Sequence, residues 1–169
     1  MEELTVFLAE TELREAAQKG EAAFLDLITD AVAEAAGGTL DADALRRLNA
    51  DQVTLLALRI LREEVSVGGF VQLIHNGYGP FFFDNPFAKA LRQWGLRDLS
   101  QMVYSAARLY RRHGDDLTRE MDDDAFMALY EAHPDFDPLD DEFVDREDEY
   151  VEQAARYVDH HLQDFVTVV

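Results

Sequence analysis

Apolar residues recur along most of the chain with the spacing of α-helices. The clearest case is residues 21–36, where they occupy one side and precede a glycine pair: Phe24, Leu27, Ile28, Ala31, Ala35 and Gly37-Gly38. A period of about 3.6 residues is typical of an amphipathic helix. The same pattern predicts helices over 4–17 (with Leu4, Phe7 and Leu8 inward), from Asp41, and over 52–66, 86–95, 98–113, 122–133 and 143–165. We therefore predict an all-α fold, a single globular domain over residues 1–169 with about seven to eight helices.

The predicted helix 52–66 differs from the others because its apolar side chains lie nearly all round it: Val53, Leu55, Leu56, Leu58, Ile60 and Leu61. Such a helix is buried in the middle of a domain, so the other helices are expected to pack around it. Asp51 is its expected N-cap. It breaks at Gly68-Gly69, which we interpret as a structural corner between helices. A phosphate-binding loop would need a preceding strand and a Lys or Ser/Thr partner, and neither is present. We interpret Phe81-Phe82-Phe83 as a loop pinned to the core, with a strand as the alternative.

The net charge of −20 is concentrated in one part of the chain. Residues 115–152 hold 17 acidic and only two basic residues, a net charge of −15, whereas residues 1–114 carry −4 and residues 153–169 carry −1. A chain that is acidic only for solubility should be acidic throughout. The charge repels nucleic acid and anionic lipid and attracts basic surfaces. The acidic N-terminus and the lack of a long apolar run predict a cytoplasmic protein that does not bind membranes.

Signals for enzyme chemistry are weak. The chain has no cysteine, which excludes thiolate chemistry and cysteine zinc sites. The acidic stretch from Asp135 fails the calcium-loop pattern, because Leu139, Asp140 and Arg146 stand at positions 5, 6 and 12. The adjacent histidines His160 and His161 lie on neighbouring sides of a helix. We predict no catalytic residue, no metal site and no cofactor, with a carboxylate- or metal-dependent enzyme kept as an alternative.

The acidic block is better explained as a docking surface for a basic protein. The candidate partner-binding residues lie on the predicted helices and the acidic loop 135–142: Asp122, Asp123, Asp124, Asp135, Asp137, Asp140, Asp141, Glu142, Asp145, Asp148, Glu149 and Glu152. The alternative is a solvated face that only keeps the protein soluble. Asp140 is the expected exception, because it can also cap the last helix.

One helix carries too few charges to imitate duplex DNA. From Asp145 to Asp159 a helix rises about 21 Å, and duplex DNA of that length shows about 12 phosphates. The helix offers six carboxylates, including Glu147 and Glu149. Mimicry therefore requires that the loop 135–142 and the Asp122–Asp124 cluster lie alongside, or that a homodimer supplies the remaining charge.

Two motifs resemble those of a known family. Glu64-Val65-Ser66-Val67-Gly68-Gly69-Phe70-Val71-Gln72 resembles the E-V-x-x-G-G-F-x-Q signature of the DNA-mimic protein family, acidic all-helical bacterial proteins. Phe136-Asp137-Pro138-Leu139-Asp140-Asp141-Glu142-Phe143 resembles the family's F-x-x-L-D-x-x-F segment. The resemblance spans about residues 55–165, and it departs from the family at Ser66-Val67, where Asn often stands.

The resemblance implies a non-enzymatic protein whose acidic face occupies the DNA-binding surface of a basic partner such as a transcription regulator. It implies no direct contact with nucleic acid. An immunity protein that neutralises a toxin is the alternative within the same class.

Overall fold

The computed structural model describes residues 2–169; Met1 lies outside the described residues. Over that range the chain forms nine α-helices, two short 3₁₀ helices and two two-residue strands, which confirms the all-α fold class. Contacts divide it into two compact units. Unit 1 contains the residues up to Arg59 together with Asp148–Val169, and unit 2 contains Ile60–Glu147. The single-domain boundary remains a prediction.

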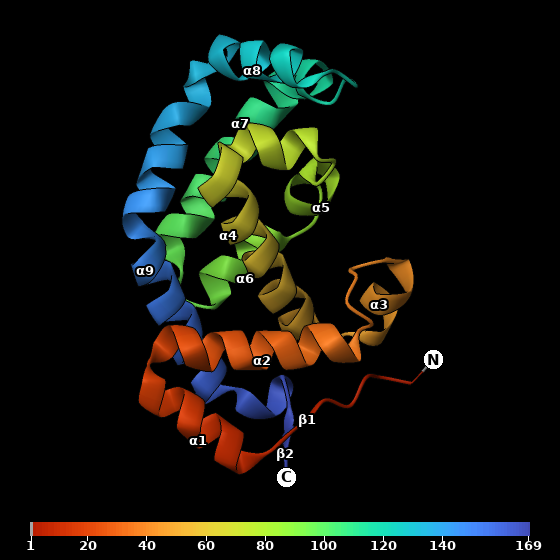
Figure 1. Ribbon diagram of the computed structural model, residues 1–169, viewed down its shortest axis with the longest axis vertical. Coiled ribbons are helices and arrows are strands. Elements are labelled where there is room, and N and C mark those ends of the chain that lie inside the picture. Colours follow the sequence, from red (N-terminus) through yellow and green to blue (C-terminus); the bar gives the residue numbers. More distant parts are fainter. Residues whose placement is uncertain (1) are drawn as a thin grey trace. The chain divides into compact units, whose positions relative to one another are not determined.

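Unit 1 is built from both ends of the chain. It contains β1 (Phe7–Leu8), α1 (Glu10–Lys19), α2 (Glu21–Ala35), α3 (Ala42–Arg47), η2 (Leu162–Asp164) and β2 (Thr167–Val168). It also contains the beginning of α4 (Ala50–His75) and the end of α9 (Asp137–His160). The two strands pair in parallel, Phe7 opposite Thr167 and Leu8 opposite Val168, and lie side by side in Figure 1. Its core is apolar and fully buried: Leu25, Ile28, Val32, Leu55, Leu58 and Val158.

The first predicted helix, 4–17, was wrong at its start. Residues 2–6 are not helical, Phe7–Leu8 is a strand, and α1 begins at Glu10. Leu8 is buried as expected, but Phe7 is 64% exposed. The strand exists because Val6 and Leu8 accept hydrogen bonds from the backbone N–H groups of Thr167 and Val169. Those partners are remote in sequence, and the local apolar spacing carries no sign of them.

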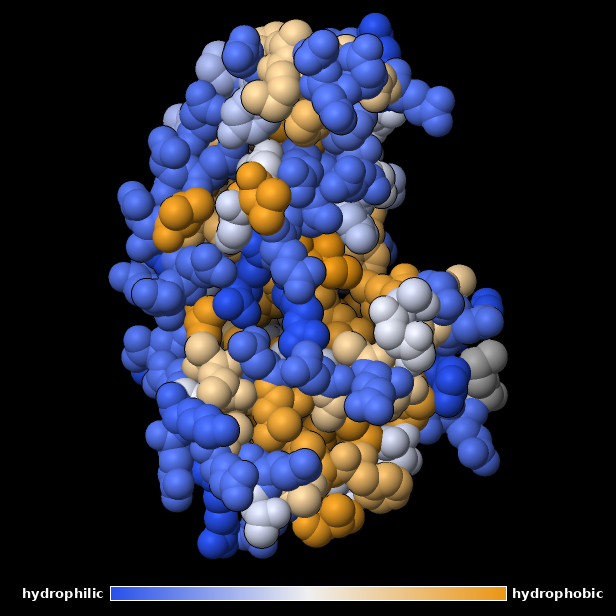
Figure 2. Space-filling view, viewed as in Figure 1, coloured by the Kyte–Doolittle hydropathy of each residue, from blue (hydrophilic) through white to orange (hydrophobic). Residues whose placement is uncertain are grey.

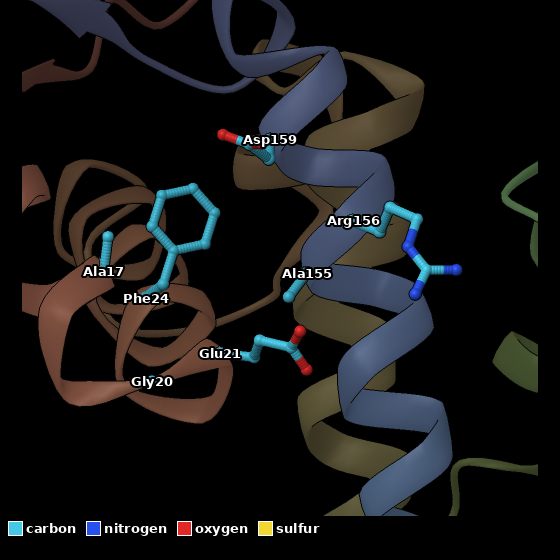
Figure 3. A pocket seen from close by; sticks show the side chains of 7 residues that line it. All are labelled: Ala17, Gly20, Glu21, Phe24, Ala155, Arg156 and Asp159. Atoms are coloured by element: carbon cyan, nitrogen blue, oxygen red, sulfur yellow. The ribbon is translucent and has the colours of Figure 1, made fainter.

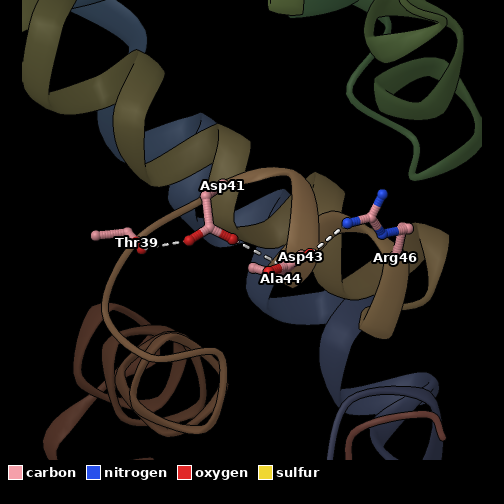
Figure 4. A network of polar contacts seen from close by, with 5 residues as sticks. All are labelled: Thr39, Asp41, Asp43, Ala44 and Arg46. Carbon is pink, nitrogen blue, oxygen red and sulfur yellow. Dashed lines mark hydrogen bonds and ion pairs between the residues drawn. The ribbon is translucent and has the colours of Figure 1, made fainter. Parts of the chain in front are cut away.

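Side-chain caps fix the starts of two helices in unit 1. The Asp41 carboxylate accepts a hydrogen bond from the Ala44 N–H at 2.9 Å and thereby caps α3, the helix predicted from Asp41 (Figure 4). That hydrogen bond lowers the pKa of Asp41. The expected cap of the next helix, Asp51, was wrong. Asn49 and Gln52 instead exchange side-chain to backbone hydrogen bonds of 2.8 and 3.1 Å, the reciprocal arrangement of a capping box.

Unit 2 contains the rest of α4, α5 (Gly79–Phe83), α6 (Phe87–Gln93), α7 (Arg97–Leu117), α8 (Asp123–Ala132), η1 (Pro134–Phe136) and the start of α9. The three consecutive phenylalanines form α5, neither the predicted loop nor a strand. The Phe82 ring meets those of Phe81 and Phe87 edge-on, with centroids 5.2 and 5.0 Å apart. Burial of Phe82 and Phe83 thus folds this segment as a helical turn against the core.

Two further helices in unit 2 begin or end at other residues than predicted. The stretch 135–142 was expected to be an acidic loop, but η1 and the first turns of α9 occupy it. Pro138 stands in the first turn of α9, where its missing N–H costs nothing. The helix predicted over 98–113 is longer, because α7 begins at Arg97 and ends at Leu117; it has no side-chain cap, and Asp98 in its first turn bonds to Arg146 at 2.7 Å.

Candidate functional site

The two signature motifs meet at one backbone position in unit 2. Gly69 interrupts α4 with φ 72° and ψ −175°, a conformation that is essentially restricted to glycine. The next residue, Phe70, donates its backbone N–H to Asp140 Oδ1 at 2.9 Å. Asp140 of α9 therefore caps the second segment of α4, although 70 residues separate the two. The predicted helix corner at Gly68-Gly69 is confirmed, with its break at Gly69.

Asp140 fits this position because Gly69 has no side chain. A Cβ atom on Gly69 would lie 2.2 Å from Asp140 Oδ2, far inside van der Waals contact. The aromatic residues of both motifs, Phe70, Phe136 and Phe143, are fully buried. The motifs thus define a tertiary contact inside unit 2.

The Asp140 carboxyl is 8% exposed, and its burial raises its pKa to about 6. The negative charges of Asp137 and Asp141 contribute to this increase in pKa, while the Phe70 hydrogen bond and the Tyr130 hydroxyl oppose it. Burial in turn raises the pKa of Tyr130, and Asp140 adds to this effect. A buried acid of this kind serves the fold, so we assign Asp140 a structural role and leave it out of the docking surface proposed below.

Several other acidic side chains of the block are also used inside unit 2. Glu147 accepts hydrogen bonds from Arg62 at 3.2 Å and from Ser66 at 3.3 Å, and thereby joins α9 to α4. Arg146 contacts both Asp98 and Glu142, at 2.7 and 3.4 Å. Glu142 is half-buried. These contacts show that part of the acidic block holds its own helices together.

Most of the block nevertheless faces solvent. Of its 17 acids only Asp140 is buried, and only Glu142 and Glu147 are half-buried. Along α9 five exposed carboxylates follow a spacing of three or four residues and so share one helix face: Asp137, Asp141, Asp145, Asp148 and Glu152. We call these five residues the acidic stripe. In Figure 2 hydrophilic residues cover most of the visible surface of α9.

The acidic stripe has nearly the charge spacing of a single DNA strand. From Asp137 to Glu152, fifteen residue steps, the helix rises about 22 Å along its axis. One DNA strand, with a phosphate every 3.4 Å or so, carries about six or seven charges over that length. The stripe carries five, so it is about three quarters as dense as one strand and well below a duplex.

The remaining predicted residues lie outside the stripe. Asp122 caps α8 through the Ala125 N–H at 2.8 Å, and Asp123 and Asp124 stand in the first turn, where negative charge is favourable. This cluster lies at the opposite end of α8 from the start of α9 (Figure 1), about 15 Å away along that helix. Asp135 lies 3.5 Å from His113 Nε2. Glu149 is exposed but off the stripe.

The described residues contain no group of three or more His, Asp or Glu side chains placed to hold a metal ion. In the same residues, no helix is both long enough and apolar enough to cross a membrane.

Comparison with known proteins agrees with the motifs. The model of the DMP19-like protein family matches residues 46–161. The chain belongs to the DMP19-like protein family. It is 30% identical over 152 residues to the DNA mimic protein DMP19 of Neisseria meningitidis serogroup B. The matched residues cover 89% of this chain and 92% of that relative. The resemblance inferred from the two motifs is thereby confirmed, and the family match contains the whole acidic stripe.

Proposed function

We propose that this protein is a non-enzymatic DNA mimic whose acidic stripe occupies the DNA-binding surface of a basic protein, such as a transcription regulator. The observation that supports this proposal most is the stripe itself, five exposed carboxylates on one face of α9 at nearly the density of one DNA strand. The relative's name describes a DNA mimic, and family membership favours the same role here. A DNA-binding surface is lined by Lys and Arg, which a row of carboxylates can engage in place of phosphates.

The stripe supplies negative charge comparable to that of one DNA strand. The charge that corresponds to the second strand of a duplex has to come from elsewhere. The Asp122–Asp124 cluster lies a helix length from the start of α9, so it does not run beside the stripe. A homodimer that sets two stripes side by side is the simpler source, and we include it in the proposal. The partner then meets two rows of negative charge, as it does on duplex DNA.

The clustering of acidic residues in the stripe favours a docking role over a role in solubility alone. Like charges three or four residues apart destabilise a helix by about 0.2–0.5 kcal/mol per pair. The stripe contains four such neighbouring pairs on one face, whereas the same acids dispersed over the chain would give equal net charge without that cost. A binding role accounts for this concentration.

The test compares two variants of equal net charge. The stripe variant carries Asp141→Asn, Asp145→Asn, Asp148→Asn and Glu152→Gln. The control variant carries four substitutions at exposed acids outside the block: Glu3→Gln, Glu12→Gln, Glu15→Gln and Glu34→Gln. Each protein is immobilised and used to capture proteins from a bacterial lysate at about 50 and 500 mM salt, where screening differs strongly. Captured proteins are then challenged with duplex DNA.

We expect the unmodified chain and the control variant to capture a DNA-binding protein at low salt and to release it to duplex DNA. The stripe variant should capture it much less. If the two variants lose binding equally, net charge rather than the stripe is responsible. Binding that resists both high salt and duplex DNA would contradict mimicry.

A further inference from the structure

Unit 1 contains a cavity of about 330 Å³ outside the acidic stripe (Figure 3). It opens between the junction of α1 with α2 and the last turns of α9. Its walls combine small residues, one aromatic ring and three charged side chains: Ala17, Gly20, Glu21, Phe24, Ala155, Arg156 and Asp159. Space is left because the small residues do not fill it; a Cβ on Gly20 would meet no atom within 4 Å. This volume is at the lower end for sites that hold small groups.

Three charged side chains line the cavity, the acids Glu21 and Asp159 and the base Arg156. In Figure 3 Glu21 and Asp159 stand on either side of the Phe24 ring, while the Arg156 side chain extends away from it. Arg156 is already ion-paired to Glu152 at 3.1 Å. Within residues 2–169, neither Glu21 nor Asp159 forms an ion pair. The cavity therefore offers two carboxylates without a cation.

The position of Asp159 adds to the case for a cationic ligand. Glu21 is the first residue of α2, where the helix dipole favours an anion. Asp159 is in the last turn of α9, where the dipole disfavours an anion and favours a cation. A positive group in the cavity would be attracted by Asp159 and by the carbonyl end of α9 together. Phe24 is 9% exposed, and the part of its ring that lines the cavity adds cation–π attraction for a group placed against it.

We propose that this cavity binds the guanidinium group of an arginine side chain supplied by a partner protein. A guanidinium is planar, stacks on an aromatic ring, and has five N–H donors that can reach carboxylates on two sides. A lysine ammonium lacks the flat face. This inference rests on the proposed function in one respect, the source of the arginine: a basic DNA-binding partner would carry arginine on its surface. The site would add a specific anchor to the general attraction of the stripe.

The test uses the isolated chain and small probes. Amide chemical shifts are followed by NMR while N-acetyl-arginine amide is added, and the titration is repeated with the citrulline derivative, which has nearly the same shape but no charge. The arginine probe should shift the amides of Gly20, Glu21, Ala155 and Asp159 and saturate. Asp159→Asn should weaken its binding about fivefold, the effect of losing an ion pair of roughly 1 kcal/mol. The matched control, Glu12→Gln, removes an exposed acid of α1 and should leave binding unchanged.

Three results would overturn the proposal. One is equal binding of the citrulline probe, another is equal weakening by Asp159→Asn and Glu12→Gln, and the third is shifts confined to the acidic stripe. Because no partner protein is present, a variant with only Asp141→Asn, Asp145→Asn and Asp148→Asn should bind the probe with at most a small change, since it keeps the Glu152–Arg156 ion pair. A failure of this site and a failure of the DNA-mimic function are thus separate outcomes.

Discussion

The carboxylate of Asp140 occupies the space where a side chain on residue 69 would be. A Cβ on Gly69 would lie 2.2 Å from Asp140 Oδ2, while Oδ1 of the same carboxylate accepts the Phe70 N–H at 2.9 Å. The glycine and the aspartate therefore depend on each other. One permits the bend in α4, and the other satisfies the backbone donor that the bend exposes.

Gly69→Ala should destabilise the protein by more than backbone strain alone. A non-glycine residue at this φ and ψ costs about 1–3 kcal/mol, and the contact with Asp140 adds to it. Gly77→Ala is the control, because Gly77 also has a positive φ of 90° but a Cβ there meets no atom within 4 Å. Urea unfolding should give a larger loss for Gly69→Ala than for Gly77→Ala. Equal losses would show that the Asp140 contact is readily relieved.

Asp140→Asn and Asp140→Ala should have different effects at pH 7. Asparagine keeps an oxygen that accepts the Phe70 N–H and removes a buried charge, so its unfolding free energy should equal or exceed that of the natural chain. Alanine leaves a buried N–H without an acceptor, which costs about 1–3 kcal/mol. Denaturant unfolding of both variants provides the measurement. Similar losses in the two variants would mean that the cap requires the negative charge.

The same residue predicts how stability changes with pH. The folded-state pKa of Asp140, about 6, lies above the ordinary value of 3.8, so the folded state holds this proton more tightly than the unfolded state. The stability contributed by the protonated carboxyl is complete below pH 3.8 and is lost as pH rises through about 6. Relative to the natural chain, Asp140→Asn should thus gain stability from pH 4 to pH 7. A difference that stays constant with pH would contradict the raised pKa.

Tyr157→Phe should destabilise unit 1 by about 1 kcal/mol, the net value of a typical hydrogen bond. The Tyr157 hydroxyl donates to the Asp51 carboxylate, at 3.2 and 3.3 Å from its two oxygens. Burial, followed by the Asp51 charge, raises the pKa of Tyr157 to about 12, above the ordinary 10. The stabilising effect should be present below pH 10 and fade as pH approaches 12. Tyr104→Phe is the control in thermal unfolding, because Tyr104 is exposed.

Removing charge from the acidic stripe should stabilise the protein. Asp141→Asn, Asp145→Asn, Asp148→Asn and Glu152→Gln together relieve four repulsive pairs along α9, for a gain of roughly 1 kcal/mol. The loss of the exposed Glu152–Arg156 ion pair offsets only part of this. The charge-matched control with substitutions at Glu3, Glu12, Glu15 and Glu34 should gain less. Thermal unfolding at low salt measures the difference, which should shrink as salt is added.

Local sequence patterns predicted what local interactions determine. Asp41 caps α3 and Asp122 caps α8 because an aspartate before a helical stretch can reach the free N–H groups of the first turn. The break in α4 was visible because a glycine pair interrupts an apolar helix. Membership of the family was evident from the two motifs.

Long-range contacts accounted for the main differences. The Phe7–Leu8 strand depends on a partner near the other end of the chain, and the role of Asp140 depends on Gly69. In an acidic stretch a buried aspartate is indistinguishable from an exposed one until its neighbours are placed. The Glu21–Asp159 cavity also combines distant segments, and no spacing in the sequence indicates it.

The composition of unit 1 has a consequence for biosynthesis. Unit 2 is one continuous stretch, Ile60–Glu147, whereas unit 1 needs both its early residues and Asp148–Val169. Domains generally fold as units while the chain is made, from the N-terminus onwards. During translation, unit 2 can therefore acquire its structure while the early part of unit 1 still lacks the contacts that Asp148–Val169 supplies. The apolar surface that this segment covers in unit 1 stays exposed until the segment leaves the ribosome, which makes this period the one in which the nascent chain is most exposed to aggregation.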